Sequence, residues 1–444
     1  MRSAPLPNVT CKAEGLFAMM QNDLKARINA ANERAFKILL ESRPVWVDVR
    51  PAIDVLPGMT PDTILHAGPP ISWSRMCGPQ QKGAINAALY ENLAASEEEA
   101  IRLIGQGQIR LAPCHDYGAV GGMAGITTAS MPMIVAEDRQ HGAVGYSQLY
   151  QGPGVQELRW EDYGRASIEQ WRWLQNVLGP ALGAAIRSRG ELDIRSIIAR
   201  ALQMGDECHN RNVAGSALLL RELAPALLQA DLDQATAGAS IRYLSRADQF
   251  FLCAGMAAAK ATVNAARDIP YSTLVTTLAR NGVDFGIKVS GLGDEWFTAP
   301  ANQVEGLYFS SEWSDDDAVP DIGDSAIMET VGLGGFVQAT APALQQFVGG
   351  SFARAVQLTH EMAEITVGVN NEFQLPALDF AGAPLGIDMR KVVQTGITPV
   401  IDTAIAHKQG GVIGAGQTRA PLACFSAALQ AFSHRYVTDR EPQS

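Results

Sequence analysis

The sequence predicts an α+β protein with several domains, in which mixed α/β N-terminal and C-terminal domains flank a helical middle domain. The chain has 444 residues, 47% of them hydrophobic, which is enough to bury more than one core. Long segments with helical hydrophobic spacing fill its centre, whereas both flanks alternate short apolar runs with Gly- and Pro-rich turns. We therefore place the domains at residues 1–160, 161–267 and 268–444.

The elements follow in order along the chain. Apolar residues at helical spacing predict a first helix over residues 13–42, and the run PVWVDVRPAIDVL that follows is β-like. Short apolar runs between residues 57 and 150 predict strands, with one helix near NLAASEEEAIRLIGQG. The middle domain consists of long amphipathic segments, typical of packed helices. Beyond it, short β-branched runs between Gly turns predict strands again.

Composition and charge exclude several functions. The net charge of −11 argues against a nucleic-acid partner or an anionic membrane surface, because both require an excess of Lys and Arg. The most apolar segments reach a Lys before the roughly 20 residues of a membrane span. The six cysteines are scattered without a CxxC pair, as in reduced proteins. With no secretory leader at the N-terminus, we expect a cytoplasmic protein.

The run MGDECHNRN collects polar residues directly after the apolar RSIIARAL. If the helix continues through it, Asp206, His209 and Asn210 share one face, and Glu207 stands four residues before Arg211 and can pair with it. A single His does not make the two-His zinc helix, so we expect no metal centre. A solvated helix surface is one interpretation. The apolar flanks indicate instead a cleft or a domain interface.

Other stretches combine Gly or Pro turns with cationic side chains, the pattern by which backbone amides and Arg or Lys hold phosphate or carboxylate. They carry His66, Arg75, Lys82, His115, Arg280, Asn281, His407, Lys408 and Arg419. The alternatives are a plain turn around His66 and Arg75, an internal ion pair at Arg280, and a solvent loop with scattered charge around Lys408 and Arg419. In DIGDSAIMET we expect Asp324 to cap a helix rather than to hold a divalent ion. Neither a nucleotide-binding motif nor a GxSxG elbow is present.

Six blocks resemble the signature blocks of the YlbE/AllG family, in the expected order between residues 57 and 421. They are HAGPPI, GGMAGITTASMPM, MGDECHNRN, ARNGVDFGIKVSGLGDEWF, DIGDSAIMETVGLGG and TGITPVIDTAIAHKQGGVIGAGQTRAP. The resemblance implies a subunit of a heteromeric oxamate carbamoyltransferase of allantoin and purine catabolism, with FdrA-type and YlbF-type partner subunits. It implies the conversion of oxalurate and phosphate to oxamate and carbamoyl phosphate, and an α+β fold with a helical middle domain.

This implied reaction ranks the candidate residues. Phosphate attack builds negative charge on the ureido oxygen, and the leaving amide needs a proton. We therefore expect His209, His115 and Arg211 to be catalytic. We expect the small anionic substrates to be bound by Arg280, Asn281, Asn212, Lys408, Arg419, His66 and Arg75. We expect neither cofactor nor metal, and an oligomeric assembly.

Three alternatives remain open. The chain could be a non-catalytic scaffold that holds the partner subunits together. It could belong to a related complex that acts on another ureido or amide acid. The third alternative is metal-dependent hydrolysis through Asp206, His209 and the DIGDS acids.

Overall fold

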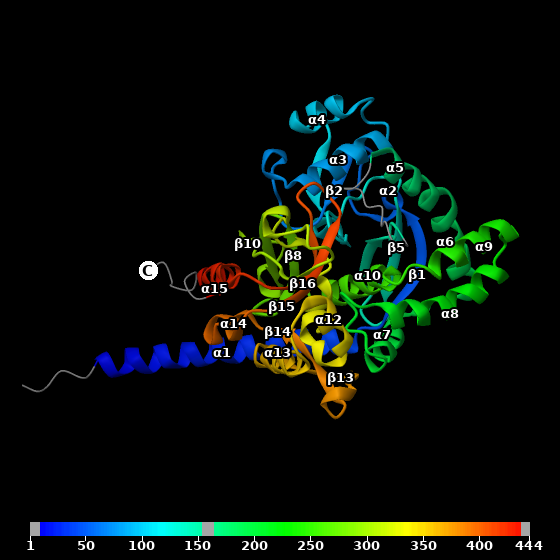
Figure 1. Cartoon of the computed structure of the whole chain (residues 1–444). Coiled ribbons are helices and arrows are strands. Elements are labelled where there is room, and N and C mark those ends of the chain that lie inside the picture. The colour runs from blue at the N-terminus through cyan, green and yellow to red at the C-terminus, as the bar shows by residue number, and fades with distance from the viewer. Residues whose placement is uncertain (1–8, 153–163, 437–444) are drawn as a thin grey trace, which may run out of the picture.

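The computed structural model describes residues 9–152 and 164–436, and its architecture confirms the predicted α+β class. A five-stranded sheet with the order β4-β6-β5-β1-β7 forms the first layer (Figure 1). Its strands are β1 (Pro44–Pro51), β4 (Ala119–Val120), β5 (Pro132–Asp138), β6 (Val144–Gln148) and β7 (Leu192–Asp193). Neighbouring strands are antiparallel, except that β4 and β6 are parallel.

Helix α10 (Phe250–Ala265) packs against this sheet and is buried along nearly its whole length, as expected for a segment that is apolar on every side. Gly145 of β6 permits the close approach. A Cβ at this position would stand 2.3 Å from the Ala261 nitrogen and 2.4 Å from the Ala257 oxygen. The helix therefore lies directly on the strand backbone, and any larger residue at position 145 would push it away.

The middle of the chain is helical, as its amphipathic segments predict. Besides α10, it contains α5 (Gly164–Trp173), α6 (Gly179–Arg189), α7 (Ile194–Gln203), α8 (Val213–Gln229) and α9 (Gln234–Leu244). Helices α6, α7 and α10 pack on β1, and the largest hydrophobic cluster draws residues from all three predicted domains. The boundary at residue 160 lies outside the described residues, so the three-domain division stays a prediction.

The C-terminal part contains three smaller sheets. The first has the order β10-β9-β8-β12, the second β11-β16-β15, and the third pairs β13 with β14. These strands are β8 (Val275–Asn281), β9 (Asp284–Val289), β10 (Phe297–Pro300), β11 (Glu305–Tyr308), β12 (Ile322–Gly323), β13 (Thr366–Leu375), β14 (Ala381–Ile387), β15 (Val400–Ala406) and β16 (Val412–Arg419). The helices are α11 (Ile327–Thr330), α12 (Gln345–Val348), α13 (Phe352–Glu364), α14 (Met389–Thr395) and α15 (Leu422–Tyr436).

The remaining N-terminal elements include the two predicted helices. Helix α1 (Val9–Glu41) covers the first prediction, and its N-terminal half projects from the body in Figure 1. The predicted second helix is α4 (Glu97–Gly105), which begins where the Ser96 side chain accepts a hydrogen bond from the Glu99 nitrogen. The others are α2 (Ala52–Val55), α3 (Gly78–Tyr90), β2 (Thr63–His66) and β3 (Arg110–Pro113).

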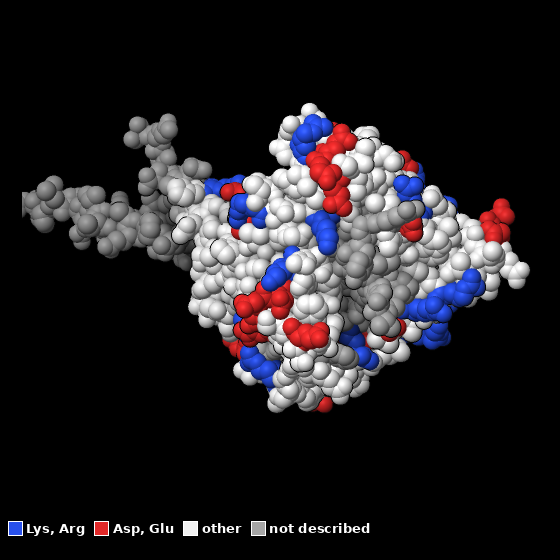
Figure 2. Space-filling view, turned by 45° about the horizontal axis from the view of Figure 1, so that its top comes forward, with Lys and Arg blue, Asp and Glu red and all other residues white. Residues whose placement is uncertain are grey.

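Two further observations bear on possible environments and partners. In the described ranges, every helix is too short or too polar to cross a lipid bilayer. Figure 2 shows Lys and Arg side chains in separate small groups that alternate with Asp and Glu. A nucleic acid would require a continuous basic surface, and this face does not present one among its described residues.

Candidate functional site

A cavity of about 860 Å³ lies between the end of β6, helix α10, the loop that joins α7 to α8, and the β15–β16 hairpin. We refer to it as the central cavity. Its cationic or protonatable lining side chains are Lys82, His209, Arg211 and His407, and the one Asp or Glu among the described lining residues is Asp248. In a chain with a net charge of −11, this local excess of basic groups suits small anionic ligands.

The MGDECHNRN run enters the central cavity as a loop. Helix α7 ends at Gln203 and α8 begins at Val213, so the predicted helix through this run is wrong. Gly205 and Cys208 adopt φ angles of 94° and 66°, which a helix excludes. Polar side chains of the run bind nearby backbone groups instead of forming a helix surface. The result is a rigid polar loop that presents His209, Asn210 and Arg211 to the cavity.

The predicted side-chain pair between Glu207 and Arg211 is also wrong. Oε2 of Glu207 accepts a hydrogen bond from the backbone nitrogen of Arg211 at 2.9 Å. The Arg211 guanidinium turns the other way, with Nε 3.3 Å from Oδ1 of buried Asp206. The Arg211 side chain keeps 31% of its surface exposed, so its guanidinium can contact a ligand in the central cavity.

His209 is held by a carboxylate behind it. Its Nδ1 lies 2.7 Å from Oε1 of Glu329, which also accepts hydrogen bonds from the backbone nitrogens of Gly335 at 3.0 Å and Asp402 at 3.1 Å. An acceptor at Nδ1 favours the tautomer with the proton there, which leaves Nε2 as a base. Gly334 makes room for the pair, because a Cβ there would stand 2.1 Å from that same Oε1. This is the general-base arrangement of a His oriented by a carboxylate.

Two further carboxyl groups lie buried beside this pair. Burial raises the pKa of Glu207 to about 8, although its oxygens accept hydrogen bonds from the backbone nitrogens of Asn210 and Arg211. Burial, followed by the charges of Glu207 and Glu329, raises the pKa of Asp402 well above its usual value. Both groups therefore favour the protonated form near neutral pH. The described residues contain no cluster of His, Cys, Asp and Glu suited to a metal ion.

His115 lies outside the lining of the central cavity, in a buried cluster behind the cavity wall. Its Nδ1 is 3.1 Å from Nζ of Lys260, and its Nε2 is 3.5 Å from Oδ1 of Asp324. Burial, then the charges of Lys260 and Lys288, lowers the pKa of His115 well below its usual value. Burial also lowers the pKa of Lys260 to about 7 and raises that of Asp324 to about 7.

The expected helix cap at Asp324 is wrong. Helix α11 begins at Ile327, after Ala326, and receives no side-chain cap. The Asp324 carboxylate instead accepts hydrogen bonds from the backbone nitrogens of Gly68 at 2.8 Å and Gly121 at 3.1 Å. Gly122 follows Gly121 and Ser325 follows Asp324, and both line the central cavity. The Asp324 carboxylate therefore ties two loops together in the wall of the central cavity.

Arg280 and Asn281 also lie in this wall rather than on the lining. The fully buried Arg280 guanidinium makes two hydrogen bonds to Asp321, at 2.7 and 3.0 Å. It also donates to the Gly323 carbonyl at 2.6 Å and to Oγ1 of Thr403 at 3.1 Å. Of these residues, Thr403 lines the central cavity. Nδ2 of Asn281 donates to the Pro69 carbonyl at 3.1 Å.

The other residues predicted to bind anions, Lys408, Arg419 and Arg75, lie outside the cavity lining and bond to protein groups. Lys408 donates to the Asp316 carbonyl at 2.9 Å, and Arg419 pairs with Glu361. Arg75 pairs with Asp284 at 2.9 Å. All three side chains stay partly exposed, so these are surface contacts.

The remaining two predicted residues, His66 and Asn212, bond to other protein groups. Nδ1 of buried His66 lies 2.9 Å from the carbonyl of Ala67, and burial lowers its pKa to about 4. Nδ2 of Asn212 donates to the His209 carbonyl at 2.7 Å and to Oε1 of Gln249 at 2.8 Å. Asn212 therefore fixes the conformation of the polar loop from behind.

Lys82 and His407, two residues of the cationic turns to which the sequence gave no final role, also line the central cavity. Nζ of Lys82, on α3, donates to the Gln409 carbonyl at 3.0 Å and ties α3 to the tip of the β15–β16 hairpin. The His407 ring stacks edge-on against Trp313, 5.0 Å between centroids. Glu329 was not assigned either. In the sequence it is the last of three acids in DIGDSAIMET, which we considered only as possible ligands of a divalent ion.

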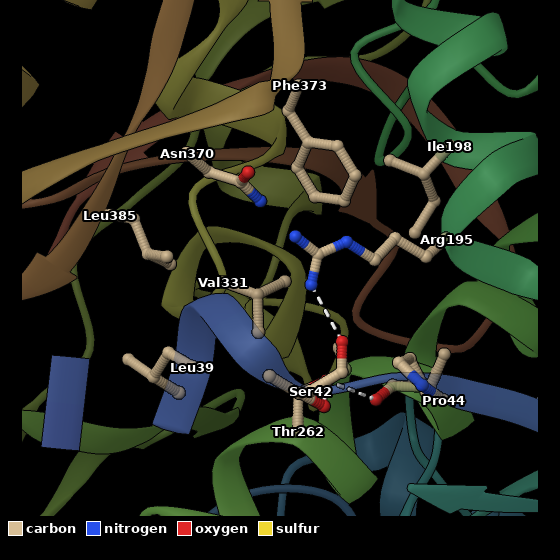
Figure 3. Close-up of a pocket in the computed structure, with 12 residues that line it drawn as sticks. Leu39, Ser42, Pro44, Arg195, Ile198, Thr262, Val331, Asn370, Phe373 and Leu385 are labelled. Atoms are coloured by element: carbon tan, nitrogen blue, oxygen red, sulfur yellow. Dashed lines mark hydrogen bonds between the residues drawn. The ribbon is translucent and has the colours of Figure 1, made fainter. Parts of the chain in front are cut away.

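A second, much smaller cavity of about 30 Å³ surrounds Arg195 (Figure 3). Here the guanidinium donates to the carbonyls of Leu40 and Ser42, both at 2.7 Å, and to Glu372 at 2.6 Å. These bonds join α1, α7 and β13. With these donors already satisfied and room for little more than a water molecule, this cavity is structural.

Comparisons with known proteins agree with this architecture. The sequence model of the family described as oxamate carbamoyltransferase subunit AllG matches residues 109–325. The chain is 45% identical to oxamate carbamoyltransferase subunit AllG of Escherichia coli strain K12, over 91% of this chain and 97% of that protein. It is 44% identical to the uncharacterized protein YahG of the same strain, over 95% of this chain and 90% of that protein.

A solved structure shows the same fold. It is the crystal structure of a conserved protein of unknown function from Enterococcus faecalis V583, with a TM-score of 0.88 and 41% sequence identity. The match covers 93% of this chain and 99% of that one. Together with the match to AllG along nearly its whole length, these findings show that the chain belongs to the AllG family of oxamate carbamoyltransferase subunits.

Proposed function

We propose that this chain is a catalytic subunit of an oxamate carbamoyltransferase, and that its central cavity binds oxalurate and phosphate. The observation that carries the proposal is the His209–Glu329 pair at a cavity that also presents Arg211 and Lys82. A carboxylate-oriented imidazole supplies proton transfer, and the two cations suit two anionic reactants. The relative AllG of Escherichia coli, named as an oxamate carbamoyltransferase subunit, supports the same activity.

The chemistry requires one proton to move. An oxygen of hydrogen phosphate attacks the carbamoyl carbon of oxalurate, and the bond from that carbon to the oxamate nitrogen breaks. The proton of hydrogen phosphate ends on the leaving nitrogen, giving oxamate and carbamoyl phosphate with no change in total charge. Nε2 of His209 can accept this proton and pass it on. In this proposal Arg211 holds the oxamate carboxylate, and Lys82 with the hairpin tip holds the phosphate; the support is that all of them line the cavity.

The expected assembly is heteromeric and cytoplasmic, with FdrA-type and YlbF-type subunits as partners, and the pathway is allantoin breakdown. The name subunit in the family description supports an assembly. The test is formation of carbamoyl phosphate from oxalurate and phosphate by this chain alone and with both partners. Activity that appears in the mixture and disappears with His209→Ala supports the proposal. Activity that survives His209→Ala would favour the scaffold alternative.

A related complex that acts on another ureido or amide acid is the second candidate. Its support is the size of the central cavity, which at about 860 Å³ exceeds what oxalurate and phosphate fill. The same assay with other ureido acids in place of oxalurate separates the two. A higher kcat/KM for one of them than for oxalurate would assign the chain to such a complex.

A further inference from the structure

Two backbone amides in the wall of the central cavity have no hydrogen-bond acceptor among the described residues. They belong to Gly122 and Met123, which both line the cavity and are partly exposed. The Gly125 nitrogen donates to the Gly122 carbonyl at 3.0 Å and closes a tight turn, in which Met123 has a φ of 52°. A positive φ at a residue other than glycine is strained, and such strain is concentrated at functional sites. Successive amides in a turn of this kind form a concave donor site for a negatively charged oxygen.

A serine hydroxyl lies beside these amides. Ser325 also lines the cavity and is 7% exposed, and its Oγ keeps accessible surface without a hydrogen-bond partner in the described ranges. A Cβ on Gly323 would stand 3.0 Å from the Met123 nitrogen and 3.4 Å from this Oγ, so both atoms lie on the same side of Gly323. An unpaired hydroxyl buried to this degree calls for a partner that arrives with a ligand. We refer to the amides of Gly122 and Met123 and the hydroxyl of Ser325 as the donor cluster.

Asp324 holds the donor cluster in place. Its carboxylate accepts a hydrogen bond from the Gly121 nitrogen at 3.1 Å, and its own backbone nitrogen donates to the Gly121 carbonyl at 2.9 Å. Gly121 directly precedes Gly122, and Asp324 directly precedes Ser325, so these bonds fix both sides of the cluster. A Cβ on Gly122 would meet only the Met256 side chain, at 3.9 Å, so the donors border apolar surface. Preorganised donors beside apolar groups stabilise developing charge more strongly than donors in water.

Hydrogen bonds of Arg280 connect the donor cluster to the polar loop. The guanidinium donates to the carbonyl of Gly323, two residues before the hydroxyl of the cluster, at 2.6 Å and to Oγ1 of Thr403 at 3.1 Å. The Thr403 carbonyl in turn accepts a hydrogen bond from Nδ2 of Asn210, the neighbour of His209, at 3.2 Å. The donor cluster and the His209 imidazole therefore border one cavity and are held by one network of bonds.

We propose that the donor cluster is an oxyanion hole for the carbamoyl oxygen of the substrate. The inference rests on the proposed function. When the phosphate oxygen bonds to the carbamoyl carbon, the π electron pair of the C=O bond moves onto the carbamoyl oxygen. The pair returns when the bond to the oxamate nitrogen breaks, and that nitrogen takes the proton. Uncharged N–H and O–H donors suit an oxygen that carries charge only between these two events, and Arg211 and Lys82 stay available for the anionic ends of the reactants.

Ser325→Ala in the complex with its partner subunits tests the hydroxyl. We expect kcat for carbamoyl transfer from oxalurate to fall by about 100-fold, with KM changed by less than about threefold. Ser325→Thr keeps a hydroxyl and should keep more of kcat than Ser325→Ala. Ser240→Ala is the matched control, because the buried Ser240 hydroxyl, on α9 and outside the cavity lining, donates to the Thr236 carbonyl at 2.9 Å. This control should leave kcat unchanged.

Sulfur in place of the carbamoyl oxygen tests the contact itself, because sulfur is a weak hydrogen-bond acceptor. For the wild type we expect kcat/KM to favour oxalurate over this thio analogue by at least about 100-fold. Ser325→Ala should reduce the preference by about tenfold, since the lost donor no longer discriminates between the two substrates. A purely structural role of Ser325 would lower kcat/KM equally for both.

Each result decides between the proposals. A wild-type complex that transfers the carbamoyl group but uses both substrates equally well overturns the oxyanion hole without any variant. A Ser325→Ala complex with the wild-type kcat, or with the full wild-type preference, overturns it as well. A wild-type complex without carbamoyl transfer overturns the proposed function, and this inference with it. Thermal unfolding of each variant identifies loss of folding, in which case the wild-type preference and Ser325→Thr decide.

Discussion

Nδ1 of His209 lies 2.7 Å from Oε1 of Glu329, although 120 residues separate the two along the chain. The backbone nitrogens of Gly335 and Asp402 hold the same carboxylate oxygen, so the position of the imidazole is fixed by three segments at once. Preorganisation of this kind is what general-base catalysis requires.

Glu329→Gln tests the orientation of His209. The amide has nearly the same shape, but it removes the negative charge and can present NH₂ instead of oxygen to the imidazole. We expect kcat of the complete complex to fall by about 100-fold with a smaller change in KM. Glu98→Gln, on an exposed part of α4, is the control and should not change kcat. Wild-type kinetics in Glu329→Gln would show that the pair is structural.

Arg211→Ala tests substrate anchoring. Its side chain, 31% exposed, is the cation of the polar loop, and its loss removes a charged contact that we estimate at roughly 2 to 5 kcal/mol. KM for oxalurate should therefore rise by at least about tenfold. Arg354 is the matched control, since it also pairs with one carboxylate, Glu361, but lies outside the lining of the cavity. Equal effects of the two substitutions on KM would remove Arg211 from the site.

The buried carboxyl of Glu207 predicts a pH dependence of stability. Its pKa is about 8 in the folded protein, against about 4.3 in an unfolded chain, so folding favours the protonated form. The stability from this group is fully present below the unfolded pKa and is lost as pH rises through about 8. The unfolding free energy should therefore fall from about pH 5 to pH 9, by an amount on the order of a few kcal/mol.

Glu207→Gln isolates this effect, because the amide does not ionise. Urea unfolding of the wild type and the variant over the same pH range provides the measurement, and the difference between the two curves should shrink or reverse as pH rises. Two curves that stay parallel would mean that Glu207 titrates with an ordinary pKa.

Arg280→Met tests the buried ion pair behind the cavity wall. Both Arg280 and Asp321 are fully buried, so removal of the cation leaves an uncompensated carboxylate in the interior. We expect a loss of roughly 3 to 5 kcal/mol of unfolding free energy. The double variant Arg280→Met with Asp321→Leu should recover part of this loss, because it removes both charges. Urea unfolding measures both, and a loss below about 1 kcal/mol for Arg280→Met would contradict the prediction.

Gly145→Ala tests the contact between β6 and α10. The added Cβ would meet backbone atoms of α10 at 2.3 and 2.4 Å, so the helix has to move, at a cost of about 1 to 3 kcal/mol or more. Gly105→Ala, in helix α4, is the control, because its nearest neighbour is the Trp73 side chain at 3.9 Å. The control should unfold at the wild-type temperature or above it. Equal melting temperatures for Gly145→Ala and Gly105→Ala would show that α10 can move away from β6 without a loss of stability.

Much of the fold is predictable because it is local. Hydrophobic periodicity identifies α1, and the Ser96 cap with the acidic turn after it identifies α4. The polar loop was misassigned because periodicity does not register the positive φ angles of Gly205 and Cys208. These angles follow from hydrogen bonds that the loop makes with residues distant in sequence, such as Nδ2 of Asn210 to the carbonyls of Thr403 and Gly416, each at 3.2 Å.

The candidate site was predictable only in part. The sequence singled out His209 and Arg211 because several polar residues stand together there. It offered Glu329 only as a possible ligand of a divalent ion, since the residue gains its contact with His209 from a segment 120 residues away. Arg280, by contrast, looked like an anion ligand because a buried ion pair and a substrate contact use the same residue type.

The pairing of His209 with Glu329 also constrains how members of this family can recombine. The two residues lie on opposite sides of residue 267, where the helical segment gives way to the C-terminal strands. A chimera joined at position 267 inherits position 209 from one parent and position 329 from the other. It keeps an oriented imidazole only when one parent supplies His at position 209 and the other supplies Glu at position 329.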